Sequence, residues 1–138
     1  MSTRLNPYIA FDGNAREAME YYQRVFDGKL TLNTFAEAGA SGEGVDGDKI
    51  MHAHLETSDG MTLMASDLAP GMEHRRGNDI AVSLSGDDGE ALRRYWEKLS
   101  DGGTVAMPLE KQMWGDEFGM CTDRFGVSWM VNISQPQG

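Results

Sequence analysis

The sequence predicts an α+β fold in which two βαβββ modules follow one another along the chain. Two observations predict it: segments 7–26 and 80–99 resemble each other at a constant offset of 73 residues, and after each of them the apolar spacing changes from helical to alternating. With 138 residues, 40% of them hydrophobic, the chain has the size and apolar content of one domain. We therefore expect a single domain over 1–138, with module one at about 5–67 and module two at about 78–134.

Each copy of the repeat begins with a short predicted strand. Ile9 and Phe11 of the first copy fall on Val82 and Leu84 of the second. The agreement continues through glycine, capping and apolar positions, which pair as Gly13 with Gly86, Glu17 with Glu90, Ala18 with Ala91, Met19 with Leu92, Tyr22 with Tyr95, Phe26 with Leu99, and Gly28 with Gly102 after one inserted residue. A register kept for residues of three kinds indicates an internal duplication.

The first strand is followed by a predicted helix. Asn14 and Glu17 form a capping-box-like start, and Gly28 is expected to end the helix in a left-handed conformation. Between them, apolar residues recur at helical spacing at positions 15, 18, 19, 22, 25 and 26. This stripe predicts an amphipathic helix packed on a sheet.

The second helix follows the same plan. Asp87 is its predicted cap, Glu90 completes the capping box, and Gly102-Gly103 stops it. Its apolar stripe consists of Ala91, Leu92, Tyr95, Trp96 and Leu99.

Three further strands complete each module. They are predicted at 29–35, 50–57 and 61–66 in module one, and at 104–109, 112–121 and 127–133 in module two. Turns at 58–60 and 123–126 precede the last strand of each module. Segment 37–48, rich in glycine and acids, is predicted to be a mobile loop, and 68–77 to connect the modules.

The composition excludes several classes of partner. Lys and Arg total 12 against 22 Asp and Glu, so a formal charge of −10 disfavours nucleic acid and anionic membranes. A lone cysteine, Cys121, excludes an internal disulfide framework and fits a reducing compartment. The first residues form no apolar run typical of a signal peptide, and no stretch of 18 apolar residues occurs. We expect a cytoplasmic protein.

Seven segments carry a resemblance to a known family: Asn6–Phe11, Gly13–Phe26, Met51–Leu55, Leu63–Asp67, Met107–Leu109, Trp114–Gly115 and Asp123–Asn132. In order and spacing they resemble the PhnB-like branch of the vicinal-oxygen-chelate superfamily, which comprises glyoxalases, bleomycin-resistance proteins and extradiol dioxygenases. The resemblance implies the glyoxalase/bleomycin-resistance fold, with curved mixed sheets around a cavity. It also implies a homodimer.

The same resemblance implies where a metal would be held. Metal enzymes of the superfamily use His, Gln or Glu from the first and last strands of each module. The matching positions are Asn6 and Met64 in module one, and Asp79 and Met130 in module two. A thioether is a poor ligand for hard or borderline metals and an Asn amide is a weak one, so one carboxylate remains where about three ligands are needed. We expect no cofactor and no metal site of the usual type.

Aromatic and Met residues are candidates for lining the cavity. These are Tyr8, Phe11, Trp114 and Trp129, together with Met64 and Met130. Ligand sites are mostly apolar with few polar groups, but the same residue types also build ordinary cores. Alternation alone does not decide between the two, because a bulge would invert it.

Three polar residues have two readings each. Asp67 either accepts a hydrogen bond from a ligand at the cavity rim or caps the turn that follows it. His52 and His54 lie two apart on one strand and so share a face. They are either a metal pair or a base with its partner, or else a polar stripe. Cys121 is expected to be a buried, inert thiol.

These observations leave three functions open. The first is a binding module that holds a small, partly apolar molecule at Asn6, Tyr8, Met64, Asp67, Asp79, Trp114, Trp129 and Met130. The second is a metal-dependent lyase, isomerase or dioxygenase with a relocated site, in which Asp79 joins His52 or His54, or Glu56 or Asp67. The third is a structural dimer with a collapsed pocket. No Gly-rich loop joins a strand to a helix in a Rossmann-type unit, so methyl transfer has no support in the sequence.

Overall fold

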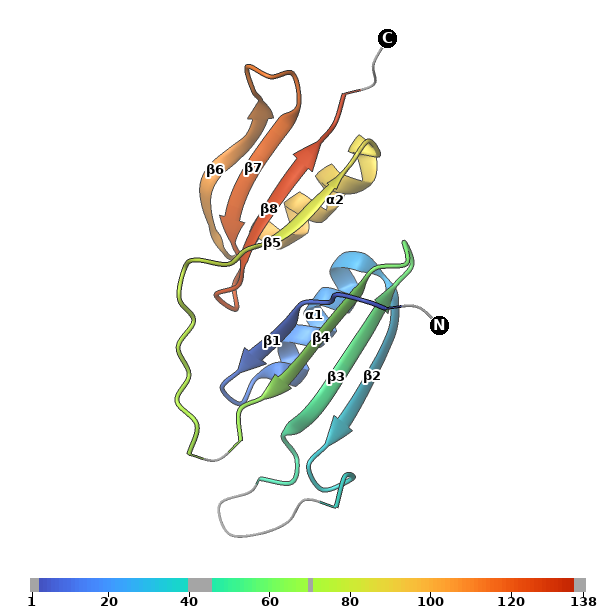
Figure 1. The fold of residues 1–138 in the computed structure, drawn as a ribbon, viewed down its shortest axis with the longest axis vertical. Coiled ribbons are helices and arrows are strands. Elements are labelled where there is room, and N and C mark those ends of the chain that lie inside the picture. Colours follow the sequence, from blue (N-terminus) through green and yellow to red (C-terminus); the bar gives the residue numbers. More distant parts are fainter. Residues whose placement is uncertain (1–2, 40–45, 70, 136–138) are drawn as a thin grey trace. The chain divides into compact units, whose positions relative to one another are not determined.

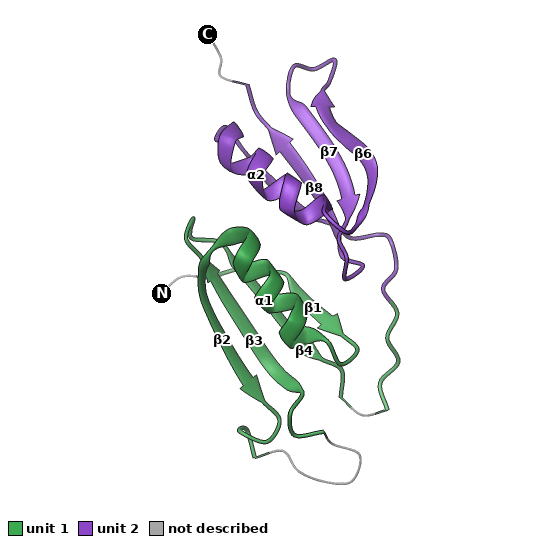
Figure 2. Cartoon of the chain, turned by 180° about the vertical axis from the view of Figure 1, so that it is seen from behind, with its two compact units in different colours: residues 1–75 green, residues 76–138 purple. Residues whose placement is uncertain are grey.

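The computed structural model describes residues 3–39, 46–69 and 71–135. It divides into two compact units, residues 1–75 and residues 76–138, called unit 1 and unit 2 (Figure 2). Each predicted module lies within one unit. No helix among the described residues is long and apolar enough to cross a membrane.

Unit 1 is a four-stranded mixed sheet with one helix. Its elements are β1 (Tyr8–Phe11), α1 (Ala15–Phe26), β2 (Gly28–Thr34), β3 (Ile50–Thr57) and β4 (Thr62–Asp67) (Figure 1). The strand order is β1-β4-β3-β2, with β1 parallel to β4 and the other pairs antiparallel. The helix covers one face of the sheet, as the views from the two sides show (Figures 1 and 2).

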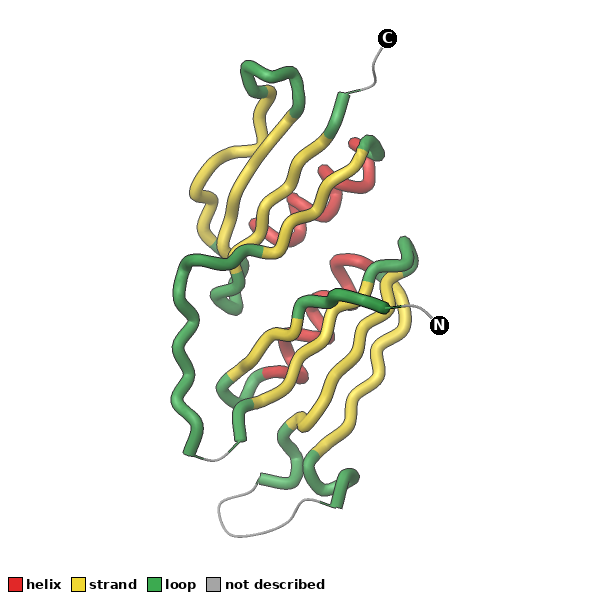
Figure 3. Tube along the Cα trace, in the orientation of Figure 1, coloured by secondary structure: helices red, strands yellow, loops and turns green. Residues whose placement is uncertain are grey.

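Unit 2 repeats this topology. Its elements are β5 (Val82–Gly86), α2 (Gly89–Ser100), β6 (Thr104–Lys111), β7 (Glu117–Thr122) and β8 (Ser128–Ile133). The order is β5-β8-β7-β6, and β5 is parallel to β8. Colouring by secondary structure shows the helix of each unit lying against its strands (Figure 3). The predicted α+β fold of two βαβββ modules is confirmed.

The core of unit 1 lies between α1 and the sheet. Met19, Tyr22 and Phe26 of the helix are buried, and so are the alternate strand residues Phe11 and Leu55. Burying each side chain of this size stabilises the fold by about 2 kcal/mol relative to exposure. Because strand side chains alternate, this burial fixes which face of each strand points away from the helix.

The two helices start differently from the prediction. Asn14 makes no side-chain capping bond. Instead the backbone N–H of Ala15 donates to Asp67 Oδ1, at the end of β4, over 2.9 Å. In α2 the cap is Asp88 and not Asp87, and its carboxylate accepts a hydrogen bond from Ala91 N at 3.1 Å.

The end of α1 also differs from the prediction. The helix ends at Phe26, and Asp27 takes the left-handed conformation with φ 56°. Gly28 is instead the first residue of β2, where an added Cβ would lie 2.1 Å from Glu56 O. In unit 2 an added Cβ on Gly103 would lie 2.1 Å from Thr122 O. Gly28 therefore corresponds to Gly103 and not to Gly102.

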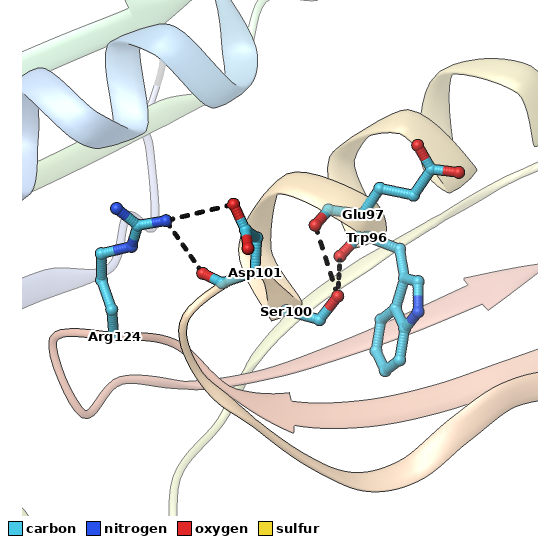
Figure 4. Close-up of polar contacts among 5 residues, drawn as sticks. All are labelled: Trp96, Glu97, Ser100, Asp101 and Arg124. Carbon is cyan, nitrogen blue, oxygen red and sulfur yellow. Dashed lines mark hydrogen bonds and ion pairs between the residues drawn. The ribbon is translucent and has the colours of Figure 1, made fainter.

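Side-chain bonds hold the end of α2 (Figure 4). Ser100 Oγ donates to Trp96 O over 2.7 Å, which satisfies a carbonyl in the last turn. Arg124, in the β7–β8 turn, donates to Asp101 O over 3.0 Å and forms an ion pair with the Asp101 carboxylate at 3.5 Å. A cation at this position also opposes the negative end of the helix dipole.

The pairing of first and last strands corrects the offset of the repeat. Tyr8 of β1 lies opposite Met64 of β4, and Ser83 of β5 lies opposite Met130 of β8. Met64 and Met130 are repeat mates at an offset of 66, so Tyr8 corresponds to Ser83 at an offset of 75 (83 minus 8) and not 73. Asn6 then corresponds to Ala81, and Asp79 is not its mate.

The remaining strands agree with the prediction apart from their ends. The β3 strand has the predicted bounds, but residues 112–116 form the turn between β6 and β7 instead of beginning a strand. The turn before β8 is confirmed by the bond from Gly126 N to Asp123 O, 3.0 Å long. Residues 40–45 of the predicted mobile loop lie outside the described residues.

Replacing Gly28 or Gly103 by Ala is expected to lower the free energy of unfolding by at least about 2 kcal/mol, because the new Cβ would force the paired strands apart. Denaturant unfolding followed by circular dichroism measures the loss. The matched control is Gly60→Ala, where φ is 83° and no atom lies within 4 Å of the new Cβ. This control should lower the free energy of unfolding by only about 1 kcal/mol, because Ala is strained in the left-handed backbone conformation. Equal losses at the three positions would contradict the close approach.

Candidate functional site

The sheet face of unit 1 that points away from α1 is called the open face of unit 1. Met64 of β4 is central to it, because it lies opposite both Tyr8 of β1 and His54 of β3. His54 in turn lies opposite Thr31, and the neighbouring His52 position lies opposite Asn33. The side chains in this row across the four strands are therefore a phenol, a thioether, an imidazole and a hydroxyl, from Tyr8, Met64, His54 and Thr31.

A hydrogen bond joins the first and third strands of this face. Tyr8 Oη and His52 Nδ1 are 3.1 Å apart, and the two ring centroids are 5.7 Å apart. The His52 and His54 rings are also neighbours, with centroids 6.4 Å apart. Tyr8 is 54% exposed and both histidines are half-buried, so a small molecule can reach this cluster.

The corresponding open face of unit 2 is more apolar. Met120 of β7 lies opposite Met107 of β6 and Met130 of β8, and Met130 lies opposite Ser83. Three thioethers therefore cross the sheet side by side. Flexible thioethers adapt to ligands of irregular shape.

Two predicted aromatic residues of unit 2 are placed differently from each other. Trp129 is buried, and its indole Nε1–H donates to Asp123 Oδ2 over 2.8 Å. It lies on the opposite side of β8 from Met130, in the core. Trp114 lies in the β6–β7 turn, 61% exposed, with its ring edge-on to Phe118 at 6.2 Å.

Asp67 has a structural role. Its Oδ1 accepts the N–H of Ala15 and its Oδ2 accepts the N–H of Ile50 at 2.8 Å. The buried carboxylate thus ties the start of α1 to the start of β3. The sequence suggested a bond to a ligand or a cap of the turn that follows β4, whereas these two bonds are made at a helix start and a strand start.

The two remaining predicted residues lie outside the strands. Asn6 is half-buried just before β1, where Pro7 O accepts a hydrogen bond from Met64 N at 3.0 Å. Asp79 is exposed in the segment that leads to β5. Within its unit, Met64 faces Tyr8, and Met130 faces Ser83.

The donor set does not fit the divalent metal that the fold family uses. The facing positions of first and last strands are Tyr8 with Met64 and Ser83 with Met130, which provide no carboxylate or imidazole. In the part of the chain that the structure describes, no three His, Cys, Asp or Glu side chains gather in a group that could hold a metal. We therefore derive no step through a metal.

The Tyr8–His52 pair was not predicted as a unit. The two residues are 44 positions apart, and only the parallel pairing of β1 with β4 brings Tyr8 to the histidine strand. The available signal was the alternation of His52 and His54 on one strand, which correctly put them on one face.

Cys121 of β7 is buried, as expected. Burial raises the pKa of its thiol to about 11 from an ordinary 9.0, and the negative charge of Asp123 adds to the shift. At neutral pH the thiolate is therefore scarce, which makes the residue a poor nucleophile.

Comparison with known proteins agrees with this architecture. A family model described as 3-demethylubiquinone-9 3-methyltransferase matches residues 3–132. Protein YjdN of Escherichia coli (strain K12) is 30% identical over 144 residues, covering 96% of this chain and 97% of that protein. The crystal structure of protein PA1353 from Pseudomonas aeruginosa is 41% identical with a TM-score of 0.84, covering 98% of this chain and all of that one.

Two more distant structures show the same fold. A PhnB protein from Bacillus cereus has a TM-score of 0.72 at 24% identity, covering 96% of this chain and 100% of that one. A glyoxylase/bleomycin resistance protein/dioxygenase domain from Frankia sp. EAN1pec has a TM-score of 0.66 at 15% identity, covering 98% and 99% of the two chains. The predicted resemblance to the PhnB-like branch and its fold is confirmed.

Replacing Asp67 by Ala is expected to lower the free energy of unfolding by about 3 kcal/mol, because two buried N–H groups lose a charged acceptor. Asp67→Asn keeps one acceptor oxygen and should lose less. Thermal and denaturant unfolding measure both. Asp46→Ala is the control, since this exposed residue accepts one local N–H, from Asp48. A loss no larger than that of the control would show that Asp67 does not hold the fold.

Stability should depend on pH through Cys121. Its folded pKa lies above its unfolded value, so the buried neutral thiol stabilises the fold fully below pH 9 and progressively less up to pH 11. Relative to Cys121→Ala, the protein should lose up to about 2 kcal/mol of unfolding free energy across this window. Denaturation midpoints measured from pH 8 to 11 test it. Parallel curves for the two proteins would refute the raised pKa.

Proposed function

This chain belongs to the family described as 3-demethylubiquinone-9 3-methyltransferase, and we propose that it binds a small, partly apolar molecule without the divalent metal usual for its fold. The observation that carries the proposal is the open face of unit 1. Tyr8, Met64 and His54 lie side by side across three strands, and His52 adds a hydrogen bond to Tyr8. On this face the thioether and the phenol ring offer apolar contact, and the imidazoles offer polar groups of the kind that orient a ligand in its site.

The open face of unit 2 supports the same function. Its row of Met107, Met120 and Met130 presents a soft, adaptable surface. A core does not require this, because the buried residues of the same sheet are packed on its other side, with Val131 and Trp129 among them.

The family description names a methyltransferase, but we do not propose methyl transfer for this chain. In Rossmann-type folds, a cofactor is held by a Gly-rich loop between a strand and a helix of a parallel sheet. Here the connection from β1 to α1 is Asp12–Asn14 with one glycine, Gly13, and both sheets are mixed. The connection between β1 and α1 therefore lacks the Gly-rich loop that holds such a cofactor.

The test is binding of a fluorescent, partly apolar and uncharged molecule, N-phenyl-1-naphthylamine, to the native protein. We expect saturable binding, and at a hundredfold excess over the dissociation constant a stabilisation of about 2.7 kcal/mol, seen as a raised melting temperature. Met64→Lys should weaken binding at least tenfold, since it places a charge at the centre of the open face. Met72→Lys, at an exposed thioether outside the sheets, is the control.

The same melts with Zn, Ni, Mn, Fe(II) or Mg distinguish the alternative of a metal-dependent enzyme. A stoichiometric metal that raises the melting temperature would overturn the metal-free proposal. Equal probe binding by the Met64 and Met72 variants would overturn the assignment to the open face. Light scattering of the same sample tests the expected homodimer, whose mass would be twice 15.2 kDa.

A further inference from the structure

The Tyr8–His52 pair is a hydrogen-bonded pair of polar side chains on the open face of unit 1. The bond of 3.1 Å joins a residue at one edge strand to a residue two strands away, across Met64 of β4. The pair is not part of the packed core, because both residues lie on the side of the sheet that α1 does not cover. Its position is therefore available for recognition.

The pair keeps a hydrogen to donate in either tautomer of the imidazole. When the Tyr8 hydroxyl donates to Nδ1, the opposite ring nitrogen of His52 carries an N–H. When Nδ1–H donates to the Tyr8 oxygen, the hydroxyl hydrogen remains free. Among the described residues, the bond to Tyr8 is the one hydrogen bond made by the His52 ring. An oxygen acceptor is thus the group that completes the pair.

The surroundings of the pair determine the rest of the ligand. Met64 and the His54 ring lie next to it and offer a thioether and a flat imidazole. Sulfur–ring contacts favour an aromatic partner. Strand β3 also carries a carboxylate on this face, that of Glu56. Glu56 lies two positions beyond His54, opposite Lys29 on β2 and Thr62 on β4. It is not placed to accept a hydrogen bond from the pair. Asn33 lies opposite His52, but among the described residues the His52 ring is bonded to Tyr8 and not to Asn33. The pair can therefore donate to an oxygen of a ligand.

We propose that the Tyr8–His52 pair is the polar anchor of the site and binds the carbonyl or phenolic oxygen of a small aromatic molecule whose ring lies on Met64. This inference rests on the proposed function and adds the chemical class of the ligand. The pair donates a hydrogen bond to the ligand oxygen, while the thioether and imidazoles contact its ring.

The experiment compares two probes of similar size on the full chain. Para-hydroxyacetophenone carries both oxygens, and toluene carries none. Binding is followed by amide and imidazole nitrogen NMR. We expect para-hydroxyacetophenone to bind about tenfold or more tighter than toluene, as a hydrogen bond worth about 1.4 kcal/mol provides. The signals of His52 should shift on binding.

Tyr8→Phe combined with His52→Phe removes the hydrogen-bond donor of either tautomer and should abolish the preference between the probes. Each single variant should keep part of the preference if the residue that remains can donate. Tyr21→Phe removes a hydroxyl from α1, on the covered side of the sheet, and should keep the preference. It also controls for general loss of stability.

The outcomes separate this inference from the proposed function. If both probes bind equally and only Met64→Lys weakens them, the open face binds ligands but the pair is not an anchor. If neither probe binds while the fluorescent probe still does, the anchor is overturned and the proposed function stands. A preference that survives replacement of both Tyr8 and His52 by Phe likewise overturns the anchor.

Discussion

The parallel pairing of the first and last strands in each unit is the constraint on which the rest depends. It joins β1 to β4 and β5 to β8, segments separated by more than fifty residues in unit 1 and more than forty in unit 2. A parallel pair needs a long crossover, and here the crossover includes a helix that packs on one face. The other face is left without a helix. The position of Tyr8 beside Met64, and of Ser83 beside Met130, follows directly from this pairing.

Much of the fold could be predicted because its signals are local. Helical stripes, turn glycines and alternating strands gave the order of elements, and β3 was predicted with its observed bounds. The offset between the modules was wrong by two residues at the first strands. Alternation has a period of two, so a shift of two leaves every side chain on its expected face. The strand register resolves it, because Tyr8 lies opposite Met64 and Ser83 lies opposite Met130.

The candidate site was less predictable because it depends on pairing between distant segments. Trp129 lies on the core side of its sheet, where its indole bonds to Asp123. Asp67 is a structural residue because its carboxylate accepts two backbone N–H groups. Neither fact has a signature in the local sequence. The histidines were correctly placed on one face, but their partner Tyr8 comes from a strand 44 residues away.

The placement of Trp129 has a practical consequence for experiments on this molecule. All three tryptophans of the chain, Trp96, Trp114 and Trp129, belong to unit 2, whereas unit 1 contains none. Intrinsic tryptophan emission is therefore a reporter of unit 2, dominated on unfolding by the buried indole that loses its bond to Asp123. Of the four tyrosines, Tyr8, Tyr21 and Tyr22 lie in unit 1 and Tyr95 lies in unit 2. Tryptophan emission therefore follows the unfolding of one half of this duplicated protein without any added label, and a transition in circular dichroism that emission does not share would belong to the other half.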